Sequence, residues 1–141
     1  MLRRVLLTSL LAASVMGGAA CGPLKYAVQA TAKAPGADGT VIADVHADQG
    51  QTRVDIKVEH LPPPDRLEPG MTSFVAWYRR DDKAPWVRMG ALKYDADGRK
   101  GVLEQATVPE VAFDALVTTE ASVDPATPSP SVILAQHVQK T

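Results

Sequence analysis

The sequence is poor in the residues that hold many small secreted domains together. It contains a single cysteine, Cys21, among 141 residues, so no disulfide can form within the chain. Only 5% of the residues are aromatic, so a hydrophobic core must be built mainly from Val, Ala, Leu and Ile. The formal net charge is −1, which does not supply the basic surface that nucleic acid requires. We therefore expect no nucleic-acid partner.

Motifs of catalysis are also missing. The chain has no Gly-x-Ser-x-Gly nucleophile motif, no His-Glu-x-x-His zinc motif and no glycine-rich phosphate-binding loop. We predict that the protein is not an enzyme and that it uses no cofactor. A periplasmic enzyme or metal-handling protein using His46 or His60 stays open as the alternative, because catalytic groups converge in space rather than in sequence.

The composition of the chain is that of an ordinary globular protein, and its first residues resemble a targeting segment. Apolar residues make up 45% and charged residues 22%, which argues against disorder of the whole chain, and the length suits one domain. Arg3 and Arg4 precede an apolar stretch over residues 5–15, and small residues follow at positions 17–20. This order of a basic, an apolar and a small-residue region predicts a secretory signal peptide over residues 1–20.

The end of this signal carries the residues Gly18-Ala19-Ala20-Cys21, which resemble the lipobox of bacterial lipoproteins. The family usually has Leu where this chain has Gly18. The resemblance implies that the signal is cut after residue 20, that Cys21 carries a diacylglyceryl group, and that residues 21–24 form the attachment site and a short tether. Gly22 is not the Asp typical of inner-membrane retention, so the resemblance favours the outer membrane over the inner membrane. A plain signal peptide with a free cysteine is the alternative.

The rest of the chain alternates in the manner of β-strands. Thr52, Val54, Ile56 and Val58 occupy one face of a stretch whose other positions are charged, which is typical of a half-buried antiparallel strand. Turn residues separate eight strand candidates, at 26–32, 41–47, 52–59, 73–78, 86–94, 99–107, 112–120 and 131–138. No helix is expected after the signal. This spacing predicts an all-β fold, either a β-sandwich or a small barrel. Of the two we expect a single antiparallel β-sandwich of immunoglobulin-like type over residues 25–141.

The bulkiest part of the chain is residues 71–98, which hold both tryptophans. Residues 73–78 are apolar enough to predict a strand buried on both faces. Residues 86–94 predict a second strand with a bulge at Gly90. The run Asp95-Ala96-Asp97-Gly98 predicts a tight turn into the next strand.

Several stretches of the second half follow one another in a recognisable order. They are Phe74-Val75-Ala76-Trp77, Val87-Arg88-Met89-Gly90-Ala91-Leu92, Asp95-Ala96-Asp97-Gly98, residues 113–120 and Val132-Ile133-Leu134. In this order they resemble the extracytoplasmic domain of anti-sigma factors of the anti-sigma-K type, with Met89 for the usual Leu and Ala121 where the family tends to have Pro. A signal peptide stands where that family has a sigma-binding domain and a membrane helix. The resemblance therefore implies a β-sandwich outside the cytoplasm, and not regulation of a sigma factor.

Two groups of side chains are candidate sites. Asp44, His46 and Asp48 share one face of an expected strand and are of metal-ligating types, but no closed geometry is implied, so we expect a solvated face and no metal. Aromatic and basic residues around the Trp-bearing hairpin are a candidate partner-binding edge, because Trp, Tyr and Arg dominate the energetics of interfaces. That edge comprises Tyr78, Arg79, Arg80, Trp86 and Arg88. We favour over this edge a solvated hairpin tip, with its charge balanced by neighbouring aspartates.

Together these features predict a lipid-anchored cell-envelope protein that acts as a non-catalytic binding or structural module. Its partners would be the membrane, through the anchor, and a further envelope protein. A sensor component of an envelope stress pathway is the second alternative, and it depends on the family resemblance alone.

Overall fold

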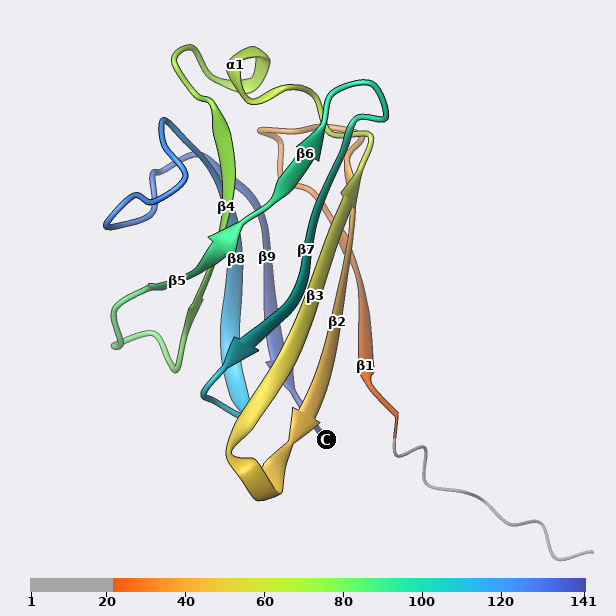
Figure 1. Cartoon of the computed structure of the whole chain (residues 1–141), viewed down its shortest axis with the longest axis vertical. Helices are drawn as coiled ribbons and strands as arrows, with labels where there is room; N and C mark the ends of the chain where they lie inside the picture. Colours follow the sequence, from red (N-terminus) through yellow and green to blue (C-terminus); the bar gives the residue numbers. More distant parts are fainter. Residues whose placement is uncertain (1–21) are drawn as a thin grey trace, which may run out of the picture.

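A computed structural model describes residues 22–141 as two antiparallel sheets packed face to face (Figure 1). The predicted signal peptide and the predicted lipid-attachment residue, Cys21, lie outside the described residues. Within residues 22–141 the strands are β1 (Leu24–Gln29), β2 (Asp38–His46), β3 (Gln51–Glu59), β4 (Ser73–Arg79), β5 (Val87–Ala91), β6 (Lys93–Asp95), β7 (Lys100–Val108), β8 (Ala112–Glu120) and β9 (Val132–Gln139). A 3₁₀ turn, η1 (Ala47–Gln49), and one turn of helix, α1 (Pro64–Leu67), complete the order.

The order of strands in the sheets is that of an immunoglobulin-like sandwich. One sheet has the order β1-β2-β3-β7-β6 and the other β5-β4-β8-β9. The run β2-β3-β7-β6 corresponds to strands A, B, E and D of immunoglobulin domains, and β4-β8-β9 corresponds to C, F and G. In these terms β5 stands where variable-type domains have strand C′, and β1 is an extra edge strand. The predicted all-β, immunoglobulin-like sandwich is therefore confirmed.

The predicted strand over residues 86–94 is wrong in its length, because the chain leaves one sheet for the other inside it. β5 pairs with β4, whereas β6 pairs with β7 in the opposite sheet. An extra residue, Met89, sits between the pairs Ala76–Gly90 and Trp77–Arg88, so the predicted bulge is present beside Gly90. Bulges bend a strand, and Leu92 then buries its side chain between the sheets. This break makes nine strands among the described residues instead of eight.

The expectation of no helix after the signal is also wrong, though by a single turn. α1 begins at Pro64, and the amide of Glu68 donates to the Pro64 carbonyl at 3.1 Å. Proline suits the first position of a helix, since its φ is already fixed near the helical value and its missing N–H is not needed there. The prolines that end β3 therefore also start this turn.

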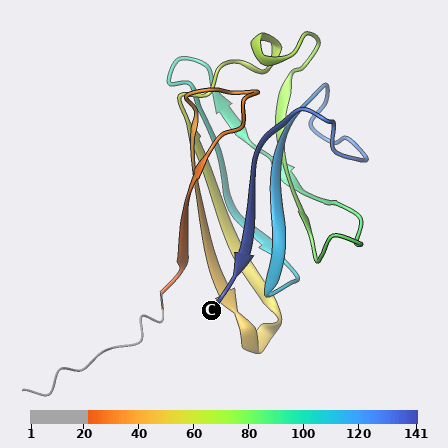
Figure 2. The same ribbon diagram turned by 180° about the vertical axis from the view of Figure 1, so that it is seen from behind.

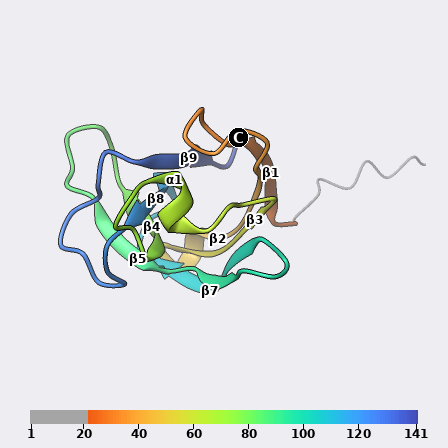
Figure 3. The same ribbon diagram turned by 90° about the horizontal axis from the view of Figure 1, so that it is seen from above.

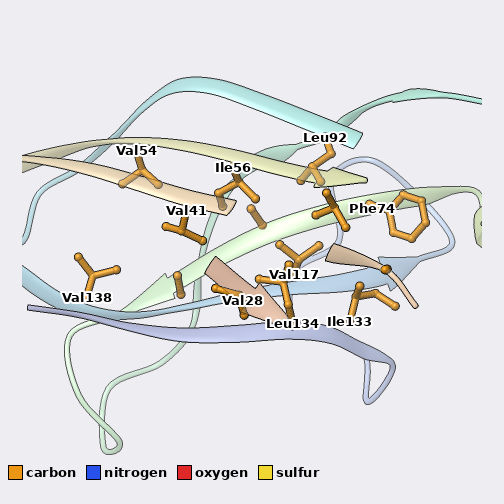
Figure 4. Packing of buried hydrophobic residues seen from close by; sticks show 14 of the residues in the cluster. Val28, Val41, Val54, Ile56, Phe74, Leu92, Val117, Ile133, Leu134 and Val138 are labelled. Atoms are coloured by element: carbon orange, nitrogen blue, oxygen red, sulfur yellow. The ribbon is translucent and has the colours of Figure 1, made fainter. Parts of the chain in front are cut away.

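The core lies between the two sheets and is almost wholly aliphatic. The alternation predicted for β3 is confirmed, because Thr52, Val54, Ile56 and Val58 are all buried. Figure 4 shows Val54 and Ile56 opposite side chains of the other sheet, among them Val117. The largest buried groups of the core besides these are Phe74, Phe113, Leu61, Ile133 and Leu134.

β4 is buried on both faces, as its apolar run predicts. Phe74 and Ala76 belong to the core between the sheets, whereas Val75 and Trp77 belong to a second cluster on the outer face of the four-stranded sheet. Trp77 is fully buried there, and Leu116 of β8 packs in the same cluster. The outer face of this sheet is therefore a second, smaller hydrophobic layer.

A series of linked, buried hydrogen bonds runs through that outer layer. The indole Nε1 of Trp77 donates to the hydroxyl of Thr118 at 2.9 Å, and that hydroxyl donates to the carboxylate of Glu120. The backbone N–H of Ser129 donates to the same carboxylate at 2.8 Å. Residues 121–131, the loop between β8 and β9, are in this way tied down onto the sheet.

The two sheets meet at one side of the sandwich through β1 and β9, which lie side by side when the molecule is seen from above (Figure 3). The hydroxyl of Tyr26 accepts from the amide of Gln139 at 3.2 Å and donates to its carbonyl at 3.3 Å. Figures 1 and 2 show η1 and the C-terminus at one end of the sandwich, with α1 and the β6–β7 turn at the other. No helix within residues 22–141 has the length and apolarity to cross a membrane.

Replacing Trp77 with Ala should destabilise the domain by about 3–5 kcal/mol, the range for truncating a large buried aromatic. Chemical denaturation followed by circular dichroism measures this loss. Trp86→Ala is the matched control, because Trp86 is only partly buried and should cost clearly less. Equal denaturation midpoints for the two variants would contradict the placement of Trp77.

Candidate functional site

Four side chains form a continuous row across the outer face of the four-stranded sheet. We call them the outer-face row: Trp86, Arg79, Asp114 and His137. Arg79 ends β4 and pairs in register with Asp114 of β8, which in turn pairs with His137 of β9. Directly opposed residues of antiparallel strands bring their side chains together. Strand pairing therefore builds this row from three distant parts of the chain.

Asp114 is the centre of the row. Its Oδ2 accepts from Arg79 Nε at 3.2 Å, and its Oδ1 lies 2.8 Å from His137 Nδ1. His137 Nε2 lies 3.1 Å from Gln139 Oε1, so both ring nitrogens of His137 have partners. One carboxylate thus holds a guanidinium and an imidazole, which fixes both cationic groups on the sheet surface.

Trp86 closes the other end of the row. The guanidinium carbon of Arg79 lies 4.4 Å from the centre of the Trp86 ring, which is the geometry of a cation–π contact. Trp86 also packs against the buried cluster that contains Trp77. The indole therefore joins the polar row to the apolar layer beneath it.

An open depression of about 370 Å³ lies along this row. Apolar side chains of β8 and β9 line it together with a guanidinium, a carboxylate, an amide and an imidazole. The residues that line it are Arg79, Trp86, Asp114, Ala115, Leu116, Ala135, Gln136 and His137. Depressions with an aromatic group and a few convergent polar groups are common binding sites.

The predicted partner-binding edge is only partly assembled in this way. Arg79 and Trp86 come together in the row, but Tyr78 turns inward against the Phe113 ring at 6.3 Å between centroids. Arg80 pairs instead with Glu110 at 2.9 Å. Burial also raises the pKa of Tyr78, which keeps its phenol neutral. Of these predicted edge residues, the structure brings only Arg79 and Trp86 together.

Arg88 is the fifth residue of the predicted edge, and its side chain bonds the loop between β8 and β9. Its Nη1 donates to the Val123 carbonyl at 3.3 Å, which links β5 to residues 121–131. Asp114 and His137, which complete the row, were missed by the sequence analysis. The alternation of Phe113, Ala115 and Val117 does place Asp114 on the outer face, but alternation alone does not reveal which strand lies beside it.

Asp44 and His46, two of the candidate metal ligands, lie in β2 of the five-stranded sheet. His46 Nε2 is 3.2 Å from Asp44 Oδ2, without the geometry of a hydrogen bond. Asp48 lies in η1, beyond the end of β2. Among residues 22–141 no three His, Cys, Asp or Glu side chains are grouped so that they could hold a metal ion.

The electrostatics of the row follow from its contacts. The hydrogen bond with His137, and then the one from Arg79, hold the pKa of the Asp114 carboxyl below its usual value. The same contact with Asp114 raises the pKa of His137 above 6.5. The cationic form of His137 is thus favoured in the folded state.

Comparisons with known protein families, with curated proteins and with solved structures gave no match to this chain.

The pKa shifts of Asp114 and His137 predict the pH range over which the row contributes to stability. Asp114 has a lowered pKa, so its contribution is present above about pH 4 and is lost as the pH falls through the folded-state pKa. His137 has a raised pKa, so its contribution is full below about pH 6.5 and is lost as the pH rises through its folded-state pKa. The pair should therefore stabilise most between these limits. The effect should be small, since the His137 side chain is 57% exposed.

A titration followed by proton NMR checks this coupling directly. In Asp114→Asn the His137 ring should lose its proton at a lower pH than in the wild type, because the carboxylate that favours the cation is gone. His46 and His60 are internal controls, since each lies beside a different aspartate, Asp44 and Asp38, and not beside Asp114. An unchanged His137 titration in Asp114→Asn would contradict the pairing.

Proposed function

We propose that this chain is a lipid-anchored cell-envelope protein whose immunoglobulin-like domain is a non-catalytic binding or structural module. The observation that carries the proposal is the position of Cys21, at the end of a signal-like segment and immediately before the folded domain. The outer membrane is favoured over the inner membrane, because Gly22 replaces the Asp of an inner-membrane retention signal.

The start of the fold supports a direct anchor. β1 begins at Leu24, one residue before the predicted start of the domain, and Leu24 packs against the core. Only Gly22 and Pro23 therefore separate the cysteine from a hydrogen-bonded strand. With two or more acyl chains on Cys21, the attachment would be stable, since each buried CH₂ contributes about 0.8 kcal/mol.

The outer-face row supports a binding role better than a catalytic one. The Asp114 carboxylate is already shared by Arg79 and His137, and Gln139 occupies the second ring nitrogen of His137, so neither group is free to accept a proton from a substrate. Trp86 and Arg79 are instead the residue types that dominate protein interfaces, and they border the depression, so a second protein of the envelope is the partner we assign to this face.

Replacing Cys21 with Ser tests the anchor. Only a thiolate is nucleophilic enough to form the thioether, so the variant should accumulate as uncleaved precursor or leave the membrane. The wild type should partition into detergent and exceed the mass of the cleaved chain by a diacylglyceryl group, usually with one more acyl chain.

Gly18→Leu is the matched control, because it restores the usual lipobox residue beside an intact cysteine. It should keep the lipid and the membrane attachment. A wild-type protein that stays in the aqueous phase with the mass of an unmodified chain would refute the proposed anchor.

A further inference from the structure

The strand pairing fixes how far the start of β1 lies from the end of the sandwich. Leu24, the first residue of β1, pairs with Ala43 of β2. β2 continues past that level to His46, and the chain then forms η1 and turns back at Gly50, whose φ is 64°. We call residues 47–50 the hairpin tip. Figure 1 shows this tip at the lower end of the sandwich, beyond the start of β1.

The part of the hairpin that extends past Leu24 is at least as long as the tether from Cys21 to Leu24. Strands rise about 3.4 Å per residue, so the three steps from Ala43 to His46 carry the hairpin roughly 10 Å past Leu24, and the tip extends further. The three steps from Cys21 to Leu24 span at most about 11 Å when fully extended. A headgroup layer roughly 5–7 Å thick takes up about half of that reach if Cys21 is held at the edge of the acyl chains.

Once Cys21 is acylated, the tether is therefore too short to hold the sandwich upright with a wide gap between the hairpin tip and the membrane. We propose that the hairpin tip rests on the lipid headgroups of the membrane that holds Cys21, with α1 and the β6–β7 turn facing away from it. The inference rests on the proposed lipid anchor and adds to it the surface that contacts the bilayer.

The composition of the tip fits hydrated headgroups and not the acyl region. Its four residues are Ala47, Asp48, Gln49 and Gly50, and all are exposed. The large exposed hydrophobic residues found within residues 22–141 are Val87, Val111 and Val123, none of which belongs to the tip. A charged aspartate is costly in hydrocarbon. The tip therefore stops at the headgroups, and the sandwich tilts on its short tether so that the tip stays at this level and does not enter the acyl region.

Energy transfer to the membrane surface tests the orientation. Asp48→Cys in the tip and Asp97→Cys in the β6–β7 turn are matched variants, because each replaces an exposed aspartate in a turn at opposite ends of the sandwich. Acylation of Cys21 leaves the introduced cysteine as the one reactive thiol. The full lipidated protein, carrying a donor dye on that thiol, is reconstituted in phosphatidylcholine vesicles that contain a headgroup-labelled acceptor lipid.

Transfer should be several-fold higher from position 48 than from position 97, because strands of nine residues separate the two ends by about 27 Å. A flexible ten-residue insertion after Pro23 should reduce transfer from position 48, since such a linker adds roughly 15–20 Å of reach. Equal or reversed transfer from an acylated protein would overturn the orientation and leave the anchor intact. An unmodified mass would overturn the anchor, and the orientation with it.

Discussion

The burial of β4 on both faces is the constraint on which the rest of the structure depends. A central strand with Phe74 inside and Trp77 outside cannot leave its outer face in water, because a buried indole contributes several kcal/mol to stability. The outer face must therefore be covered by parts of the chain beyond the two sheets. Trp86 and residues 121–131 provide that cover.

The cover is fixed by hydrogen bonds as well as by apolar packing. Glu120 is buried, with 4% of its surface exposed, and it accepts from the Thr118 hydroxyl and the Ser129 amide. A buried carboxylate that lost these donors would be costly, so the loop and the strand constrain each other. The Trp77 indole belongs to the same chain of bonds. A stable outer layer in turn holds Trp86 beside Arg79, and so the outer-face row depends on the burial of β4.

The sides of the sandwich show how the fold protects its edges. On one side the chain passes directly from β5 to β6, so the two sheets are joined covalently there. The edge strand β6 is only three residues long. On the other side Tyr26 of β1 bonds the backbone of Gln139 in β9. Short or bonded edges offer few free backbone groups to other chains. The partner proposed for the outer-face row would be recognised by side chains and would need neither of these edges.

The sequence by itself determined the faces of the strands. The alternation in β3, the dense apolar run of β4 and the Asp-Gly turn before β7 all predict their elements, because side-chain direction in a strand depends only on the parity of position. Tertiary structure decided which strands are neighbours. It divided residues 86–94 between two sheets at Leu92, and it set Asp114 between Arg79 and His137. Those contacts join residues far apart in the chain, and no local pattern encodes them, because strand pairing is selected by the packing of the whole core.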